Sequence, residues 1–133
     1  MLKFQYMILN ESMNDSNIQQ KTLNQSLVDR YKDKYPTLRR VRITNDTKGI
    51  ALFTNNELIG IINVDIPRKY IISLEVFKPY KGKGFSYKLL DIAIRLGAKN
   101  LSVRKTNHIA IETYKKHGWH IKNEDNYMYY MVR

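Results

Sequence analysis

Residues 70–90 read YIISLEVFKPYKGKGFSYKLL, and the rest of the chain is organised around this stretch. Its first part is apolar and rich in β-branched residues, which favours a strand with at least one face in a core. Pro79 has no amide donor, so this strand should end near Lys78. After residues 81–86, KGKGFS, apolar positions recur at helical spacing until Gly97 supplies a stop. We therefore expect a strand, a glycine turn and a helix that begins directly at that turn.

The glycine turn has an electrostatic consequence. The first N–H groups of a helix lack internal partners, and the helix dipole places about half a positive charge there. Gly82 and Gly84 have no Cβ atom to hold a phosphate away from these amides, while Lys81 and Lys83 add positive charge. The spacing is neither that of a P-loop nor that of a dinucleotide-binding fingerprint. The turn therefore predicts a site for a phosphate or pyrophosphate.

The turn resembles the acyl-CoA pyrophosphate loop of the GCN5-related N-acetyltransferase (GNAT) superfamily, Gln/Arg-x-x-Gly-x-Gly/Ala. Lys81 stands where Gln or Arg is usual, and Ser86 stands where Gly or Ala is usual. About twenty residues downstream, the chain also resembles the family's pattern Asn-x-x-Ala-x-x-x-Tyr-x-x-x-Gly-Phe. The matching positions are Asn107, Ala110, Tyr114, Gly118 and, in place of Phe, Trp119. The resemblance covers roughly residues 58–133.

This resemblance implies an α+β, three-layer GNAT fold, in which a mixed, mostly antiparallel sheet has a central splayed parallel strand pair and is flanked by helices. It implies an acetyl-CoA-dependent N-acetyltransferase that acetylates a primary amine by direct attack. Pantetheine would then pair with the main chain of the strand before the loop. The co-substrate-binding residues implied in this way are Leu74, Val76, Lys81, Gly82, Lys83, Gly84, Phe85, Ser86 and Asn107.

Two side chains are candidates for proton transfer. Asn107, Ala110 and Tyr114 share one helix face, because they differ by three, four and seven positions. The Tyr114 phenol, with an ordinary pKa of ~10, is our candidate acid for a leaving thiolate whose thiol has a pKa of ~8.5. Glu75 is the candidate base, directly or through water. Ribosomal-protein alanine acetyltransferases, which resemble this chain near Ser102, have Glu at that position. Because serine cannot act as that base, acetylation of the amino terminus of a ribosomal protein is a weaker hypothesis for this chain.

Composition bounds the remaining possibilities. The net charge is +11, and residues 66–133 carry +9 of it, part of which suits the phosphates of CoA. The chain has no cysteine, and its three histidines share no ligand spacing with carboxylates, so we expect no metal site. No apolar run approaches a membrane span and no signal peptide is recognisable, so we expect a cytoplasmic protein without membrane contact.

The rest of the chain predicts one domain over residues 1–133. We expect a strand at residues 2–9 and a helix from Asp15 or Ser16 to Asp33. Strict alternation predicts a strand at residues 38–43. The later expected strands are 49–54 and 58–64, joined by an Asn55-Asn56 turn, then 99–104 parallel to the residue-70 strand, and finally 119–122 paired with 127–132.

Two other readings of the sequence remain open. One is a CoA-binding module of the same fold without turnover, motivated by Ser86 and Ser102. The other is a basic nucleic-acid-binding protein, motivated by the charge surplus and by Arg39, Arg40 and Arg42. The acceptor amine could belong to a small molecule, a protein or a nucleic acid, and the surplus charge leaves room for a polyanionic partner. Because dimerisation through C-terminal strands is common in the resembled family, a homodimer is also open.

Overall fold

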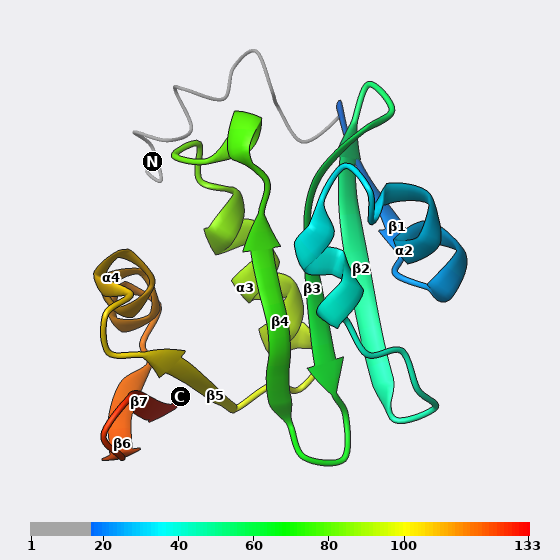
Figure 1. The fold of residues 1–133 in the computed structure, drawn as a ribbon. Coiled ribbons are helices and arrows are strands. Elements are labelled where there is room, and N and C mark those ends of the chain that lie inside the picture. The colour runs from blue at the N-terminus through cyan, green and yellow to red at the C-terminus, as the bar shows by residue number, and fades with distance from the viewer. Residues whose placement is uncertain (1–16) are drawn as a thin grey trace.

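The computed structural model describes residues 17–133 of the chain. Within them, seven strands form one sheet in the order β1-β2-β3-β4-β5-β7-β6 (Figure 1). Only the β4–β5 pair in this described part is parallel, and every other neighbouring pair is antiparallel. Helices cover both faces, so the expected mixed, three-layer α+β architecture with a parallel pair is confirmed.

The strands are β1 (Ile18–Thr22), β2 (Thr47–Thr54), β3 (Glu57–Asp65), β4 (Tyr70–Val76), β5 (Asn100–Arg104), β6 (His120–Glu124) and β7 (Met128–Val132). The α-helices are α2 (Gln25–Tyr31), α3 (Phe85–Arg95) and α4 (His108–Lys116). Two short 3-10 helices, η3 (Pro36–Arg40) and η4 (Lys78–Tyr80), complete the described elements. The predicted strand at residues 2–9 and the predicted caps Asp15 and Ser16 lie outside the described residues.

The predicted β2–β3 hairpin is confirmed, and its turn chemistry explains it. Asn55 and Asn56 both have positive φ, at 50° and 66°. Asparagine tolerates this left-handed region better than most residues, and two such residues in succession suit the twist of a tight hairpin. The hairpin fixes β3 as the antiparallel neighbour of β4.

The central strand β4 separates from β5 soon after it begins. Its parallel pairing with β5 consists of Tyr70 opposite Asn100, whereas β3 pairs with β4 from Tyr70 through Val76. A register irregularity interrupts the β3–β4 pairing next to Asn63. Figure 1 shows β5 turning away from the upper half of β4. Among residues 17–133, the edge of β4 that faces β5 therefore has no strand partner along most of its length.

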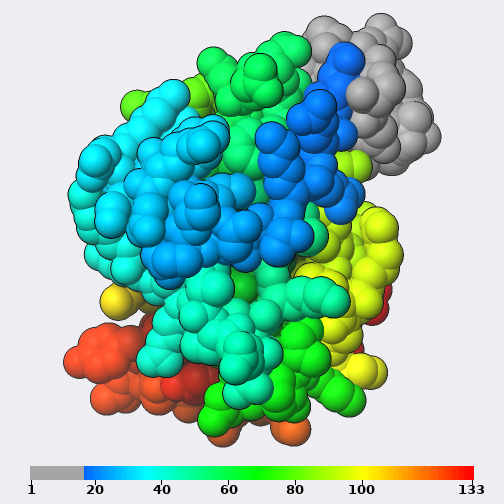
Figure 2. Space-filling model, turned by 90° about the vertical axis from the view of Figure 1, so that its right-hand side faces the viewer, coloured from blue at the N-terminus to red at the C-terminus, as the bar shows by residue number. Residues whose placement is uncertain are grey.

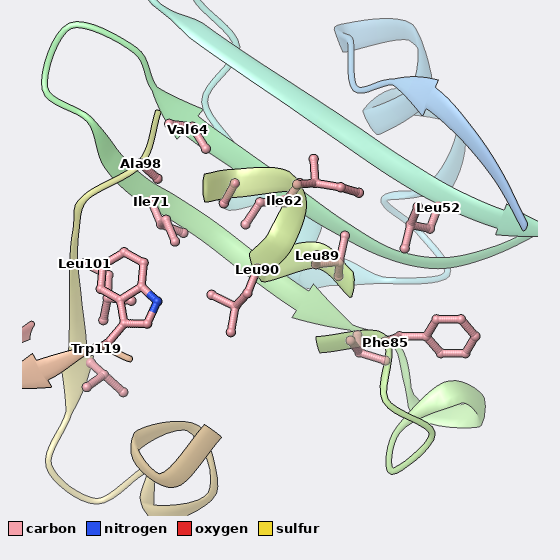
Figure 3. Packing of buried hydrophobic residues seen from close by; sticks show 14 of the residues in the cluster. Leu52, Ile62, Val64, Ile71, Phe85, Leu89, Leu90, Ala98, Leu101 and Trp119 are labelled. Atoms are coloured by element: carbon pink, nitrogen blue, oxygen red, sulfur yellow. The ribbon is translucent and has the colours of Figure 1, made fainter. Parts of the chain in front are cut away.

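The core beneath α3 holds this divergence in place. Leu89 and Leu90 are fully buried on α3 and belong to one apolar cluster with side chains of β3, β4 and β5. Trp119 lies beside Leu101 in Figure 3 and is buried in the same cluster. A buried aromatic of this size contributes a large apolar area, so the cluster ties β5 and α4 to the α3 layer although β4 and β5 scarcely pair.

The opposite face of the sheet is covered by α2 and η3, which lie in the blue and cyan part of Figure 2. The predicted helix over residues 16–33 is wrong in its first part, because residues 18–22 pair with β2 as an edge strand. Asn24 then caps the shorter helix α2 by accepting a 2.9 Å hydrogen bond from the amide of Leu27. The edge strand is mostly exposed and polar, so its pattern carries no apolar alternation to reveal it.

The predicted strand at residues 38–43 is also wrong. Pro36 begins η3 instead, as its fixed φ suits the first position of a helical turn. Leu38 is fully buried under this turn. The arginines expected on one strand face therefore separate: Arg39 pairs with Asp33 at 2.6 Å, while Arg40 lines a cleft.

Candidate active site

A cleft of about 440 Å³ lies between β4, the glycine loop and α4. Three segments far apart in the sequence meet there, because β4 and β5 diverge. Most of the site residues expected from the sequence line this cleft: Leu74, Glu75, Val76, Lys81, Gly82, Ser86, Asn107 and Tyr114. The structure thus brings together the loop motif and the Asn–Tyr motif on one surface.

At Gly82, the glycine loop presents its backbone to the cleft. Gly82 and Gly84 have φ values of 76° and 88°, a region that residues with a Cβ rarely adopt. A Cβ built on Gly82 would meet nothing within 4 Å, so the space beside this residue is open. Gly84 is the N-cap of α3 and has no side chain to cap its first turn, which also contains no acidic residue. The loop therefore suits an anion at a helix N-terminus.

Tyr80 anchors the start of this loop to the body of the protein. Its hydroxyl donates a hydrogen bond to the carboxylate of Glu57, at the start of β3. Its ring makes an edge contact with Phe85, with ring centroids 6.1 Å apart. Burial and the Glu57 carboxylate raise the pKa of Tyr80 to about 12, so this donor stays protonated. The contacts of Tyr80 with Glu57 and Phe85 therefore hold the start of the glycine loop in place against β3 and α3.

Three of the expected binding residues do not line the cleft: Lys83, Gly84 and Phe85. The Phe85 side chain packs in the core and is only 5% exposed, so its ring does not line this cleft. Its main chain still lies at the first turn of α3. Gly84 contributes the turn itself through its left-handed conformation.

The start of α4 positions the second motif. The side-chain oxygen of Asn107 caps the helix by accepting a 3.2 Å hydrogen bond from the amide of Ala110. One turn further on, Tyr114 is half-buried and lines the cleft. Burial raises the pKa of the Tyr114 hydroxyl above its usual value, so it stays protonated at neutral pH. This hydroxyl has no hydrogen-bond partner among residues 17–133, which leaves it free to donate.

A second cleft, of about 450 Å³, opens between η3, β4 and the end of β5. Leu74, Glu75, Asn107 and Tyr114 line both clefts, so these four residues mark the junction between them. At this junction the Glu75 carboxylate accepts a 2.7 Å hydrogen bond from the hydroxyl of Thr37. Two routes therefore converge on the unpaired part of β4.

Three residues that line the second cleft from η3 and the end of β5 were not expected in a transferase site: Thr37, Arg104 and Arg40, which was a candidate only for nucleic-acid binding. Thr37 and Arg40 were hidden by the expectation of a strand at residues 38–43. Pro36 was the available signal, since proline favours the first position of a helical turn. Ser102 also lines this cleft, where its hydroxyl and that of Tyr70 form a hydrogen bond between β5 and β4.

No group of histidine and acidic side chains suited to a metal ion occurs among the described residues. Within the same part of the chain, each helix is too short or too polar to cross a bilayer.

Solved structures with this fold include several acetyltransferases. Naa50 of Arabidopsis thaliana, solved with the bisubstrate analogue CoA-Ac-MVNAL, is 20% identical over 88% of this chain and 98% of that chain, with a TM-score of 0.68. PseH of Campylobacter jejuni, solved with acetyl coenzyme A, is 23% identical over 87% of this chain and 97% of that chain, with a TM-score of 0.60. The ribosomal-protein-S18-alanine N-acetyltransferase of Escherichia coli is 13% identical over 86% of this chain and 91% of that chain, with a TM-score of 0.70.

No curated protein sequence matches the chain. The sequence model of the acetyltransferase (GNAT) family, in contrast, matches residues 11–119. This range includes the glycine loop, the splayed strands and the helix that carries Tyr114. The chain is therefore a member of the acetyltransferase (GNAT) family.

Proposed function

We propose that this protein transfers the acetyl group of acetyl-CoA to a primary amine by direct attack. One observation carries the proposal: the Tyr114 hydroxyl, which has no hydrogen-bond partner in residues 17–133, and the Glu75 carboxylate line the junction of two clefts. One cleft has the glycine loop at its wall, and the other lies between η3, β4 and the end of β5. A donor and an acceptor can thus meet between an acid and a base.

The first cleft suits the donor. Its loop offers helix-terminal amides and Lys81 to a pyrophosphate. The unpaired edge of β4 near Leu74 and Val76 offers strand-like hydrogen bonds to the amide groups of pantetheine. That PseH of Campylobacter jejuni was solved with acetyl coenzyme A, and Naa50 with a bisubstrate analogue, supports the same donor for this chain.

The reaction needs two proton movements. The neutral amine attacks the thioester carbonyl carbon, and a new C–N bond forms as the carbonyl opens to a tetrahedral intermediate. The intermediate collapses, the C–S bond breaks and CoA leaves as a thiolate. Glu75 takes the proton that the nitrogen loses, directly or through water, and the Tyr114 hydroxyl supplies one to the sulfur. Proton exchange with solvent then restores both side chains.

Titration calorimetry with acetyl-CoA and CoA at low salt tests the proposal, together with an assay of CoA release on a panel of primary amines. We expect binding of both ligands and acetylation of at least one amine. Gly84→Glu should abolish binding, because it places a carboxylate at the mouth of the pyrophosphate site. Absence of binding to the wild-type chain would show the proposal to be wrong, while binding without any transfer would indicate a CoA-binding module without turnover.

A further inference from the structure

We propose that the acceptor amine is a small molecule that also carries a carboxylate or phosphate, and that Arg40 and Arg104 bind this anionic group in the second cleft. The inference rests on the proposed function, since it concerns the acceptor of that reaction. It goes beyond that function by assigning two residues and a chemical class of substrate.

The two arginines approach the second cleft from different elements. Arg40 ends η3, Arg104 ends β5, and both line the cleft beside the Glu75 and Tyr114 junction. Neither guanidinium forms an ion pair or hydrogen bond with any side chain in residues 17–133. By contrast, Arg39 pairs with Asp33 at 2.6 Å, and Arg68 pairs with Asp65 at 2.9 Å. Within the described part of the chain, Arg40 and Arg104 thus bring to one cavity two positive charges that form no ion pair.

The sign of the cleft follows from its other charged groups. Glu75 is the one acidic side chain that lines it in the described part of the chain, and its carboxylate already accepts the hydroxyl of Thr37. Two guanidinium groups therefore face one carboxylate in this cleft. A second ammonium group on the acceptor would be repelled there, whereas an anion would be attracted.

Guanidinium groups suit this task because their planar donors match the oxygens of carboxylates and phosphates. An anion held at the arginines would leave the amine of the same molecule to reach Glu75 at the junction. The volume of about 450 Å³ fits a small molecule such as an amino acid, a phosphorylated amino alcohol or an amino sugar phosphate.

A matched panel of amines tests the inference. It pairs amino acids with their amides, and phosphorylated amino alcohols and amino sugars with their unphosphorylated forms, and it includes spermidine as a cationic amine. The rate of CoA release gives kcat/KM for each, corrected for the fraction of neutral amine. We expect an anionic member to exceed its neutral partner by about tenfold or more, because charged hydrogen bonds discriminate at this level. The carboxylate and phosphate pairs show which anion is preferred.

Arg40→Gln and Arg104→Gln should each bring this preference close to unity by raising KM for the anionic acceptor. Calorimetric binding of acetyl-CoA should stay unchanged in both variants. Arg39→Gln is the matched control: it removes the same charge from η3, but its side chain pairs with Asp33 outside the cleft, so the preference should remain. If Arg39→Gln keeps the preference for the anionic acceptor, the loss in the other two variants does not come from the change in net charge alone.

The results separate failure of the inference from failure of the proposed function. With acetyl-CoA binding intact, equal or better use of neutral or cationic amines overturns the anionic acceptor and leaves the transferase proposal in place. The same holds if the two arginine variants keep the wild-type preference. If acetyl-CoA does not bind at all, the transferase proposal fails, and the inference fails with it.

Discussion

The hydroxyl of Thr37 donates a 2.7 Å hydrogen bond to the carboxylate of Glu75, across 38 positions of sequence. This bond joins η3 to β4 at the junction of the two clefts. It fixes the orientation of the carboxylate while leaving lone pairs to accept a proton from an incoming amine. A base needs this kind of positioning before its pKa matters.

Replacing Glu75 with Gln keeps the shape of the side chain and removes its basicity. We expect kcat to fall about 100-fold, in the range typical of a lost general base, while calorimetric binding of acetyl-CoA is retained. Thr37→Val should cause a smaller fall, because it loosens the carboxylate without removing it. Glu112→Gln, at an exposed position of α4, is the control with the same charge change and should keep full activity. Equal activity of the Glu75 and Glu112 variants would contradict a role for Glu75.

Tyr114→Phe removes the proton donor and keeps the ring. We expect kcat to fall about 100-fold with little change in acetyl-CoA affinity, because the thiolate then leaves unprotonated. Burial raises the pKa of the Tyr114 hydroxyl, so wild-type activity should persist through neutral pH and decline only above about pH 10, where the hydroxyl ionises. This alkaline decline should be absent from the variant. Tyr127→Phe, at a 72% exposed side chain, is the control, and a Tyr114 variant that behaves like it would favour a module without turnover.

Gly82 and Gly97 offer a matched pair for the loop. Both have positive φ, at 76° and 96°, and an added Cβ would meet nothing within 4 Å at either position. Gly82→Ala and Gly97→Ala should therefore lose a similar free energy of unfolding, about 1 kcal/mol, from backbone strain. Gly82→Ala alone should weaken acetyl-CoA binding in calorimetry, because Gly82 lines the cleft. If both substitutions leave affinity unchanged, the ligand does not approach the Gly82 backbone.

Tyr80→Phe tests the anchor of the loop. Loss of the hydrogen bond to Glu57 should lower the free energy of unfolding by about 1 kcal/mol. The pKa of Tyr80 in the folded protein, about 12, lies above the ordinary value of a tyrosine. The hydrogen bond to Glu57 therefore contributes its full share to the free energy of unfolding below about pH 10, and this contribution is lost as the pH rises towards 12.

Denaturant unfolding of the wild type and the Tyr80→Phe variant at several pH values measures the difference between their free energies of unfolding. It should be constant through neutral pH and shrink above about pH 10. Tyr31→Phe is the control, since the Tyr31 ring packs against Phe53 and its hydroxyl has no hydrogen-bond partner among the described residues. A Tyr80 effect that grows with pH would contradict the assigned hydrogen bond.

The strand, loop and helix of residues 70–96 could be predicted because local chemistry decides them. Glycine permits the left-handed turns, and the apolar period of α3 identifies its buried face. The Asn107 cap and the position of Tyr114 follow in the same way from spacing along one helix. The loop and α4, in contrast, face a common cleft only because β4 and β5 diverge.

Two secondary-structure predictions are wrong, and in both segments tertiary packing outweighs the local sequence pattern. Residues 18–22 are mostly polar and exposed, and they form a strand because the edge of β2 satisfies their backbone. Residues 36–40 form a 3-10 helix because Leu38 is buried beneath it, although the apolar alternation that follows is typical of a strand. The second mistake matters for function, since this turn delivers Thr37 and Arg40 to the second cleft.

The sequence by itself determined the family, the glycine loop and the helix that carries Tyr114, because these depend on residue types at fixed short spacings. The tertiary structure alone decided that Glu75 meets Thr37, that Phe85 turns into the core, and that Arg40 and Arg104 line one cavity. The physical reason is that these contacts join segments distant in sequence, whose meeting depends on how the layers pack on the sheet.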